Sequence, residues 1–223
     1  MTNMFRELAT RFDLEHSSNI VDIGCGSGRL AYPFAHFLKD GRYFGCDVWE
    51  DGIRWCTDNI AAGHDNVTFH TIPSKNNYYF DDRDDAVQNE YTLPFLPDAD
   101  IDLAFAISVF THLVREDSLA YMHELKRMLK PDGCAFITAF IIDHHFFKYV
   151  KDTGAHRAVK EAEPGCFYAY SGQDFFGGYS YKVWREMIEQ AGLQIVSYEV
   201  GKWAAKPGAR NYQDTFVLVH EPS

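Results

Sequence analysis

Short apolar runs alternate with longer amphipathic stretches along most of the chain, and this alternation limits the fold more than any other feature. The first five runs are residues 20–23, 43–47, 67–72, 101–106 and 134–140, and two more lie near 194–200 and 215–219. Between them, apolar residues recur at helical spacing, for example Leu119, Met122 and Leu125. Strands alternating with helices form βαβ units. The pattern therefore predicts an α/β protein with a parallel, doubly wound sheet.

The first apolar run leads directly into three alternate glycines, Gly24, Gly26 and Gly28, which are followed by a helical pattern. Glycine allows the backbone to turn sharply and a ligand to approach the main chain. A dinucleotide fingerprint, Gly-x-Gly-x-x-Gly, needs glycine at position 29, where this chain has Arg29. The spacing therefore favours a ligand without a pyrophosphate, and a nicotinamide-dependent oxidoreductase is kept as the alternative.

Two carboxylates accompany this loop. Asp22 lies at the end of the first strand, where it can orient the loop or accept a hydrogen bond from an ammonium group. Asp47 ends the second strand, a position suited to bonding both hydroxyls of a ribose. Val48 follows and is expected to pack on a purine ring.

At this point the residues resemble a family. Residues 21–28 look like motif I of the class I S-adenosylmethionine-dependent methyltransferases, and residues 93–102, 108–113 and 125–133 are similar to later segments of that family in the same order. The resemblance covers most of residues 18–140. It implies a Rossmann-like, seven-stranded, mostly parallel sheet whose last strand is antiparallel, and S-adenosyl-L-methionine as the cofactor.

The resemblance also implies a set of cofactor-binding residues. These are Asp22, Gly24, Gly26, Gly28, Asp47, Val48, Asn89 and Ile107. The adenine contact depends on the alignment of a long insertion: aligning Leu93-Pro94-Phe95 selects Asn89, whereas counting from the end of the third strand selects a residue in 74–77.

The acceptor side is expected where irregular segments reach the carboxyl edge of the sheet. We expect a single methyltransferase domain over residues 1–223, with a substrate or lid insertion at 141–179 that is rich in aromatic residues and has Gly177-Gly178 as a hinge. Because an antiparallel last strand starts at this same edge, residues 201–214 are expected to face the site. Their candidates for the substrate edge are Trp203, Arg210, Tyr212, Gln213 and Asp214.

Histidines are the candidates for catalysis. His112 follows the fourth strand and is the first candidate for a general base, with a histidine that bonds its own backbone as the alternative. His144 and His145 lie in the insertion and are further candidates for a base or for substrate binding. No metal is expected, although His144, His145 and His156 or the acidic run at 81–85 offer ligands, because adjacent histidines seldom converge on one ion.

Charge and composition narrow the partners. The net charge of −11, without any run of Lys and Arg, disfavours nucleic acid. Apolar runs of membrane-spanning length and a signal-peptide core are both missing from the sequence, so a cytoplasmic protein is expected. The predicted function is methylation of a small-molecule acceptor, most simply on oxygen of a saccharide or a specialised metabolite. A catalytically silent domain that binds the cofactor is the second alternative, and a homodimer is compatible with either.

Overall fold

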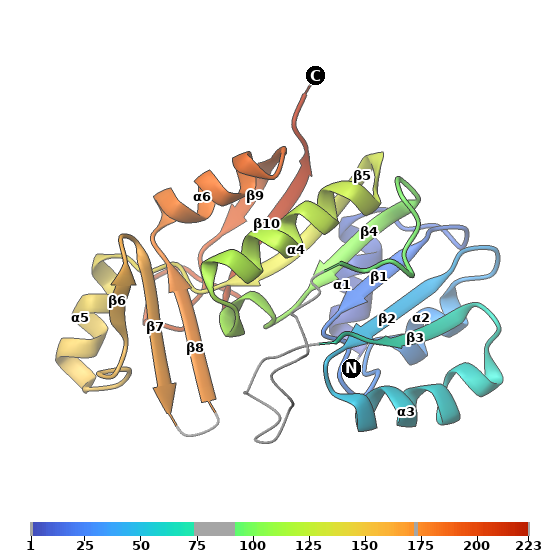
Figure 1. The fold of residues 1–223 in the computed structure, drawn as a ribbon, viewed down its shortest axis with the longest axis horizontal. Helices are drawn as coiled ribbons and strands as arrows, with labels where there is room; N and C mark the ends of the chain where they lie inside the picture. Colours follow the sequence, from blue (N-terminus) through green and yellow to red (C-terminus); the bar gives the residue numbers. More distant parts are fainter. Residues whose placement is uncertain (1, 74–91, 172–173, 223) are drawn as a thin grey trace.

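A computed structural model describes residues 2–73, 92–171 and 174–222. Its centre is a seven-stranded sheet of order β3-β2-β1-β4-β5-β10-β9, in which β10 is antiparallel to both of its neighbours (Figure 1). The strands are β1 (Ile20–Ile23), β2 (Tyr43–Asp47), β3 (Val67–Thr71), β4 (Ile101–Ala106), β5 (Leu129–Ala139), β9 (Leu193–Glu199) and β10 (Asp214–His220). The predicted sheet with an antiparallel last strand is confirmed.

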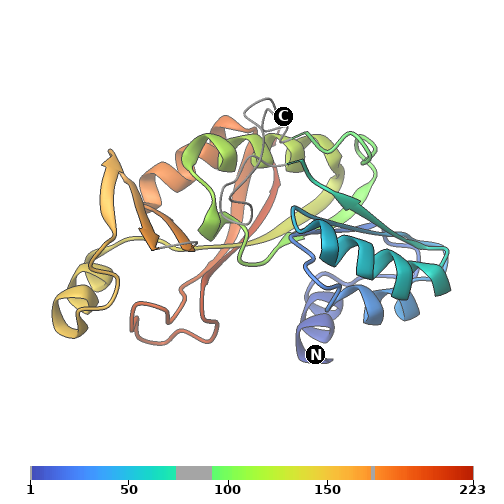
Figure 2. The same ribbon diagram turned by 60° about the horizontal axis from the view of Figure 1, so that its bottom comes forward.

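Helices cover both faces of this sheet (Figure 2). One face carries α1 (Thr2–Arg11), α2 (Ala31–Phe37) and α3 (Glu50–Asn59), and the other carries α4 (Arg115–Met128) and α6 (Tyr181–Gln190). A separate apolar cluster fills the space between each face of the sheet and its helices. Phe34 of α2 belongs to the cluster on the first face and Trp184 of α6 to the cluster on the second, and both side chains are fully buried. Among the described helices, none has the length and apolar character needed to cross a membrane.

The start of β5 differs from expectation. The sequence predicted a strand over residues 134–140, but β5 already begins at Leu129 and includes Pro131–Gly133, residues typical of a turn. Pairing with β4 moves from Ile101–Leu129 to Leu103–Cys134, so the turn residues form an irregularity inside the strand. A β-bulge of this kind keeps a strand continuous while the turn-forming residues stay outside the ladder.

The insertion at 141–179 is more regular than predicted. It forms α5 (His144–Thr153) and a second, antiparallel sheet of β6 (Lys160–Glu163), β7 (Cys166–Ser171) and β8 (Asp174–Tyr179). These elements lie together at the end of the molecule opposite α3 (Figure 1). A small core joins them to the loop before β10, with Phe146, Phe167 and Trp203 buried in it.

The glycine pair in the insertion does not form the expected hinge. Gly177 and Gly178 lie within β8 and pair with Tyr168 and Phe167 of β7, respectively. A Cβ atom on Gly177 would lie 2.6 Å from the carbonyl oxygen of Leu113. Glycine at 177 therefore allows β8 to approach the segment that follows β4, which fixes the small sheet against the main domain.

Candidate active site

The glycine loop joins β1 to α2 at the carboxyl end of the parallel strands. Gly24, Gly26 and Gly28 have φ angles of +77°, +53° and +71°, values that favour glycine. The Gly24 N–H donates to the Cys46 carbonyl at 2.7 Å, which ties the loop to the end of β2. The sharp turn predicted from the spacing is therefore present.

The three glycines differ in what surrounds them. A Cβ atom on Gly24 would overlap Cγ2 of Val109, and one on Gly28 would lie 2.7 Å from Cδ1 of Ile60. A Cβ atom on Gly26 would meet nothing within 4 Å. Gly24 and Gly28 are thus required by packing, whereas Gly26 leaves bare main chain facing open space. This is the arrangement a ligand lying over the backbone requires.

Asp47 reaches from the end of β2 to this loop. Its Oδ2 accepts from the Gly26 N–H at 2.7 Å, and its Oδ1 accepts from the Trp49 N–H at 2.8 Å. Two backbone donors therefore hold the carboxylate beside the open side of Gly26. The half-buried Val48 follows and packs against the apolar cluster on the α4 face. A carboxylate, an apolar side chain and bare main chain fit the ribose, purine and tail of an adenosyl ligand.

Asp22 lies under the loop. Its side chain is buried, and Oδ2 accepts a hydrogen bond of 2.5 Å from the Tyr43 hydroxyl on β2. Burial raises the pKa of Asp22 to about 7, with the Tyr43 hydrogen bond acting in the opposite direction. This hydrogen bond ties the carboxylate to β2, and both expected roles of Asp22, orienting the loop and accepting from an ammonium group, stay predictions.

The remaining cofactor residues fall in two groups. Ile107 follows β4 and lines a small cavity of about 190 Å³ with Met4 and Tyr212. Asn89 and the alternative adenine contacts at 74–77 lie outside the described residues.

A larger cavity of about 550 Å³ lies where the segment after β4, the end of β5, the insertion and the loop before β10 meet. Its lining residues are Ser108, Thr111, His112, Phe140, His156, Arg157, Ala158, Val159, Ala169, Phe175, Phe176 and Gln213. They come from the segment after β4, the end of β5, the insertion and the loop before β10. These are the segments that the sequence expected to reach one edge, and the structure brings them together.

His112 lies in this cavity, at the end of a 3₁₀ turn (η2, Phe110–His112). Its Nδ1 is 3.0 Å from the Phe175 carbonyl oxygen. A carbonyl oxygen only accepts, so Nδ1 carries the hydrogen and a neutral ring has its lone pair on Nε2. The hydrogen bond to β8 thus selects the tautomer that a general base needs.

His144 and His145 are not among the residues that line the cavity. They start α5, where Oδ1 of Asp143 caps the helix by accepting from the His145 and Phe146 N–H groups. Ligand atoms of Asp143, His144 and His145 lie within 4.8 Å of one another, a spacing that a metal ion fits. The ammonium of Lys206, 3.4 Å from Asp143 Oδ2, opposes a cation there. The catalytic role of both histidines stays a prediction.

The loop at 201–214 contains structural residues as well as site residues. Asp214 and Trp203 are buried, and Trp203 Nε1 donates to Asp214 Oδ2 at 2.6 Å. Both were expected at the substrate edge, but the structure places them in the core instead. Gln213, one residue earlier, lines the cavity as expected. Side chains of neighbouring residues in an extended segment point to opposite sides, which separates Gln213 from Asp214.

Sequence reasoning missed part of the cavity. Phe140 and the segment 156–159 line it, but only His156 drew attention, and as a metal ligand. His156 has a φ of +53°, unusual for a residue other than glycine. Burial lowers the pKa of His156, which favours its neutral form. Phe140 had a signal, because it ends an apolar run at the carboxyl edge of the sheet.

A doubly wound sheet with a glycine loop after β1 and an acid after β2 defines a class of α/β domains that bind nucleoside-containing cofactors. Residues 21–137, more than half of the chain, match the family model described as a methyltransferase domain. The chain therefore belongs to the methyltransferase domain family, whose cofactor is S-adenosylmethionine, and this assignment takes the place of the nicotinamide alternative.

Curated relatives agree over the same region. The chain is 27% identical over 120 residues to the ubiquinone biosynthesis O-methyltransferase of Sinorhizobium fredii, covering 54% of this chain and 46% of that protein. It is equally identical, over the same length, to an uncharacterized methyltransferase of Schizosaccharomyces pombe, of which 39% is covered. The chain thus spans less than half the length of these relatives.

Solved structures share the fold over nearly the whole chain. The PH0226 protein from Pyrococcus horikoshii superposes with a TM-score of 0.65 at 15% identity, covering 99% of this chain and 89% of the other. A SAM-dependent methyltransferase from Methanosarcina mazei gives 0.62 at 16% identity, with 97% and 98% covered. At such identities the likeness shows the fold.

Proposed function

We propose that this chain is an S-adenosylmethionine-dependent methyltransferase acting on a hydroxyl group of a small molecule. One arrangement carries the proposal. In the segment after β4, Val109 packs against Gly24 of the glycine loop, whereas Ser108 and His112 line the large cavity. A methyl donor on the loop and an acceptor in the cavity therefore lie on two sides of one short segment. The cavity of about 550 Å³ lies in the size range of sites that bind small molecules.

When bound, S-adenosylmethionine would supply a methyl group attached to a positively charged sulfur. As the acceptor oxygen bonds to the methyl carbon, the sulfur keeps the electron pair of the broken sulfur–carbon bond. The protein has to hold that oxygen close and in line. It also has to receive the proton that the hydroxyl loses. Nε2 of His112 fits this second task because Nδ1 is committed to the Phe175 carbonyl.

Two measurements test the proposal. S-adenosylhomocysteine is expected to raise the melting temperature of the protein while NAD does not. Labelled methyl groups from S-adenosylmethionine are expected to appear in compounds of a metabolite extract. Binding without any transfer of label supports the silent-domain alternative, and stabilisation by NAD alone contradicts the proposal.

The variant His112→Asn is expected to lower kcat by about 100-fold or more, because the side-chain amide keeps a donor for the Phe175 carbonyl but has no basic lone pair. Turnover of the labelled acceptor and the affinity for S-adenosylhomocysteine are measured together, and the affinity is expected to stay unchanged. His123→Asn, on the exposed side of α4, is the matched control. Wild-type turnover in His112→Asn would leave His112 a structural residue.

The variant Asp47→Ala is expected to weaken binding of S-adenosylhomocysteine by more than about tenfold, which is about 1.4 kcal/mol. The loss combines the ribose contact with the support that Asp47 gives to the Gly26 N–H. Isothermal titration calorimetry measures the affinity, and circular dichroism checks that the fold is kept. Asp51→Ala, an exposed acid of α3, is the control. Unchanged affinity removes Asp47 from the ribose role.

A further inference from the structure

Aromatic side chains form one wall of the large cavity. The rings of Phe140 and Phe176 are stacked, with centroids 4.9 Å apart and planes 7° apart. The ring of His156 extends this wall, with its centroid 5.3 Å from that of Phe176. Ala158, Val159 and Ala169 add further apolar lining. The two phenylalanine rings face each other and the His156 ring is tilted by 45° to that of Phe176, so this wall is a cluster of stacked and tilted rings. An aromatic lining of this kind favours an apolar, aromatic ligand surface.

The hydroxyl groups at the other end of the cavity are already bonded within the protein. The Ser108 Oγ donates to Gln213 Oε1 at 2.9 Å, and the same oxygen also accepts from the Oγ1 of Thr138, which is not among the lining residues, at 2.7 Å. The Thr111 Oγ1 donates to the Ser108 carbonyl at 3.1 Å. A saccharide carries many hydroxyls, and each one that is buried without a partner is costly. This lining therefore suits a molecule with few hydroxyl groups.

Arg157 adds a positive charge to the cavity. Its guanidinium lies against the backbone of Gly154, and a Cβ atom on Gly154 would displace the guanidinium, because it would overlap Nη2 of Arg157. Arg157 is exposed, and within the described residues neither a carboxylate nor a hydrogen-bond acceptor is paired with its guanidinium, whereas Arg115 at the start of α4 faces Glu163 at 3.9 Å. In a chain of net charge −11, an arginine left without an acidic partner beside a cavity points to an anionic ligand.

We propose that the acceptor is a planar aromatic compound that bears a carboxylate. Its ring lies along the wall of Phe140 and Phe176, and Arg157 binds its carboxylate. The hydroxyl to be methylated faces His112. This inference rests on the proposed function and narrows the acceptor to one chemical class.

Four probes separate ring shape from charge. 3,4-Dihydroxybenzoate is planar and anionic, catechol is planar and neutral, glucuronate is a charged sugar, and glucose is a neutral sugar. Their affinities are measured by calorimetry with and without S-adenosylhomocysteine. We expect 3,4-dihydroxybenzoate to bind at least about tenfold more tightly than each of the other three. Arg157→Gln is expected to reduce its affinity to that of catechol and to leave the affinity for catechol unchanged.

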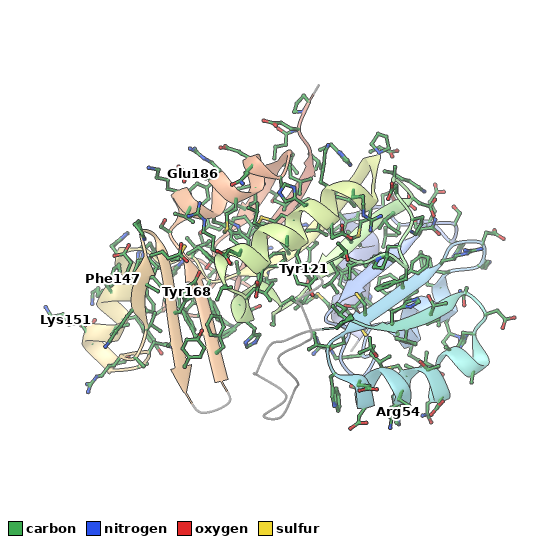
Figure 3. The ribbon with its side chains drawn as sticks, in the orientation of Figure 1. Arg54, Tyr121, Phe147, Lys151, Tyr168 and Glu186 are labelled. Atoms are coloured by element: carbon green, nitrogen blue, oxygen red, sulfur yellow. The ribbon has the colours of Figure 1, made fainter. Side chains whose placement is uncertain are left out.

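Arg54→Gln is the matched control, because it removes the same charge from an exposed site on α3, at the opposite end of the molecule from α5 (Figure 3). Equal binding of 3,4-dihydroxybenzoate and catechol, tighter binding of a sugar, an unaffected Arg157→Gln variant or no binding of any probe would each overturn the inference. If the wild-type protein does not bind S-adenosylhomocysteine at all, that result contradicts the proposed function and is distinguished in this way from a failure of the present inference.

Discussion

Gly26→Val is expected to abolish binding of S-adenosylhomocysteine while the protein still folds. The reason is that a Cβ atom at Gly26 meets no protein atom within 4 Å, so the new side chain fills the open space over the main chain. The φ of +53° adds a strain of about 1–3 kcal/mol, which lowers the melting temperature without preventing folding. Calorimetry measures the loss. No binding is expected even at ligand concentrations about 1000-fold above the wild-type Kd, which means a loss of at least about 4 kcal/mol of binding free energy.

Gly208→Val separates the loss of binding from backbone strain. Gly208 also has a positive φ, +76°, and open space at its Cβ position, but it lies in the loop before β10. The two variants are expected to lose similar stability, and only Gly26→Val is expected to lose the ligand. Tight binding by Gly26→Val would show that the ligand does not lie over the glycine loop, and the proposed position of the cofactor would fail with it.

Asp214→Ala is expected to destabilise the protein by about 3–5 kcal/mol. Asp214 is fully buried, and its carboxylate accepts from the Trp203 indole at 2.6 Å and from the N–H groups of Gly201 and Ile141, both at 3.0 Å. It also faces the buried ammonium of Lys206 at 3.3 Å. Removing the carboxylate leaves several buried donors without an acceptor, and it leaves the buried ammonium of Lys206 with only the partly exposed Asp143 as a carboxylate partner among the described residues. Urea unfolding measures the change.

Two further variants show where the loss comes from. Asp51→Ala breaks an exposed ion pair with Arg54 and is expected to change stability little. The double variant Asp214→Ala with Lys206→Met is expected to recover part of the loss, because it also removes the buried charge that has lost its buried carboxylate partner. A small effect of Asp214→Ala would mean that the loop before β10 does not depend on this carboxylate.

Asp214 also connects stability to the site. Its partners lie in the loop before β10 and at Ile141, where the insertion begins, and the neighbouring residues Phe140 and Gln213 line the cavity. The carboxylate therefore holds together two of the segments that form the cavity wall. The sequence analysis expected Asp214 at the substrate edge. Its backbone does lie beside the cavity, but its side chain points into the core.

Much of the fold was predictable because the signals are local. An apolar run of four to six residues identifies a buried parallel strand, and β1, β2 and β4 have the predicted bounds. In the insertion, residues 166–170 of β7 form such a run, but β6 and β8 lack one. All four residues of β6 are exposed, and β8 contains Gly177 and Gly178, which are poor strand formers. These strands form because the chain pairs with itself in antiparallel fashion, and a single strand carries no sign of that pairing.

The sequence by itself determined the order of the strands along the chain and the place of the glycine loop after β1. It also determined that Asp47 lies next to Gly26, because both residues belong to one βαβ unit, whose geometry fixes the distance between the ends of its two strands. Only the tertiary structure decided which side chains share the cavity. The bond between Ser108 and Gln213 joins residues 105 positions apart, and the cavity positions of His112 and Arg157 depend on the small sheet packing against the segment after β4. Contacts between distant segments follow from the packing of whole elements, and local residue patterns do not encode them.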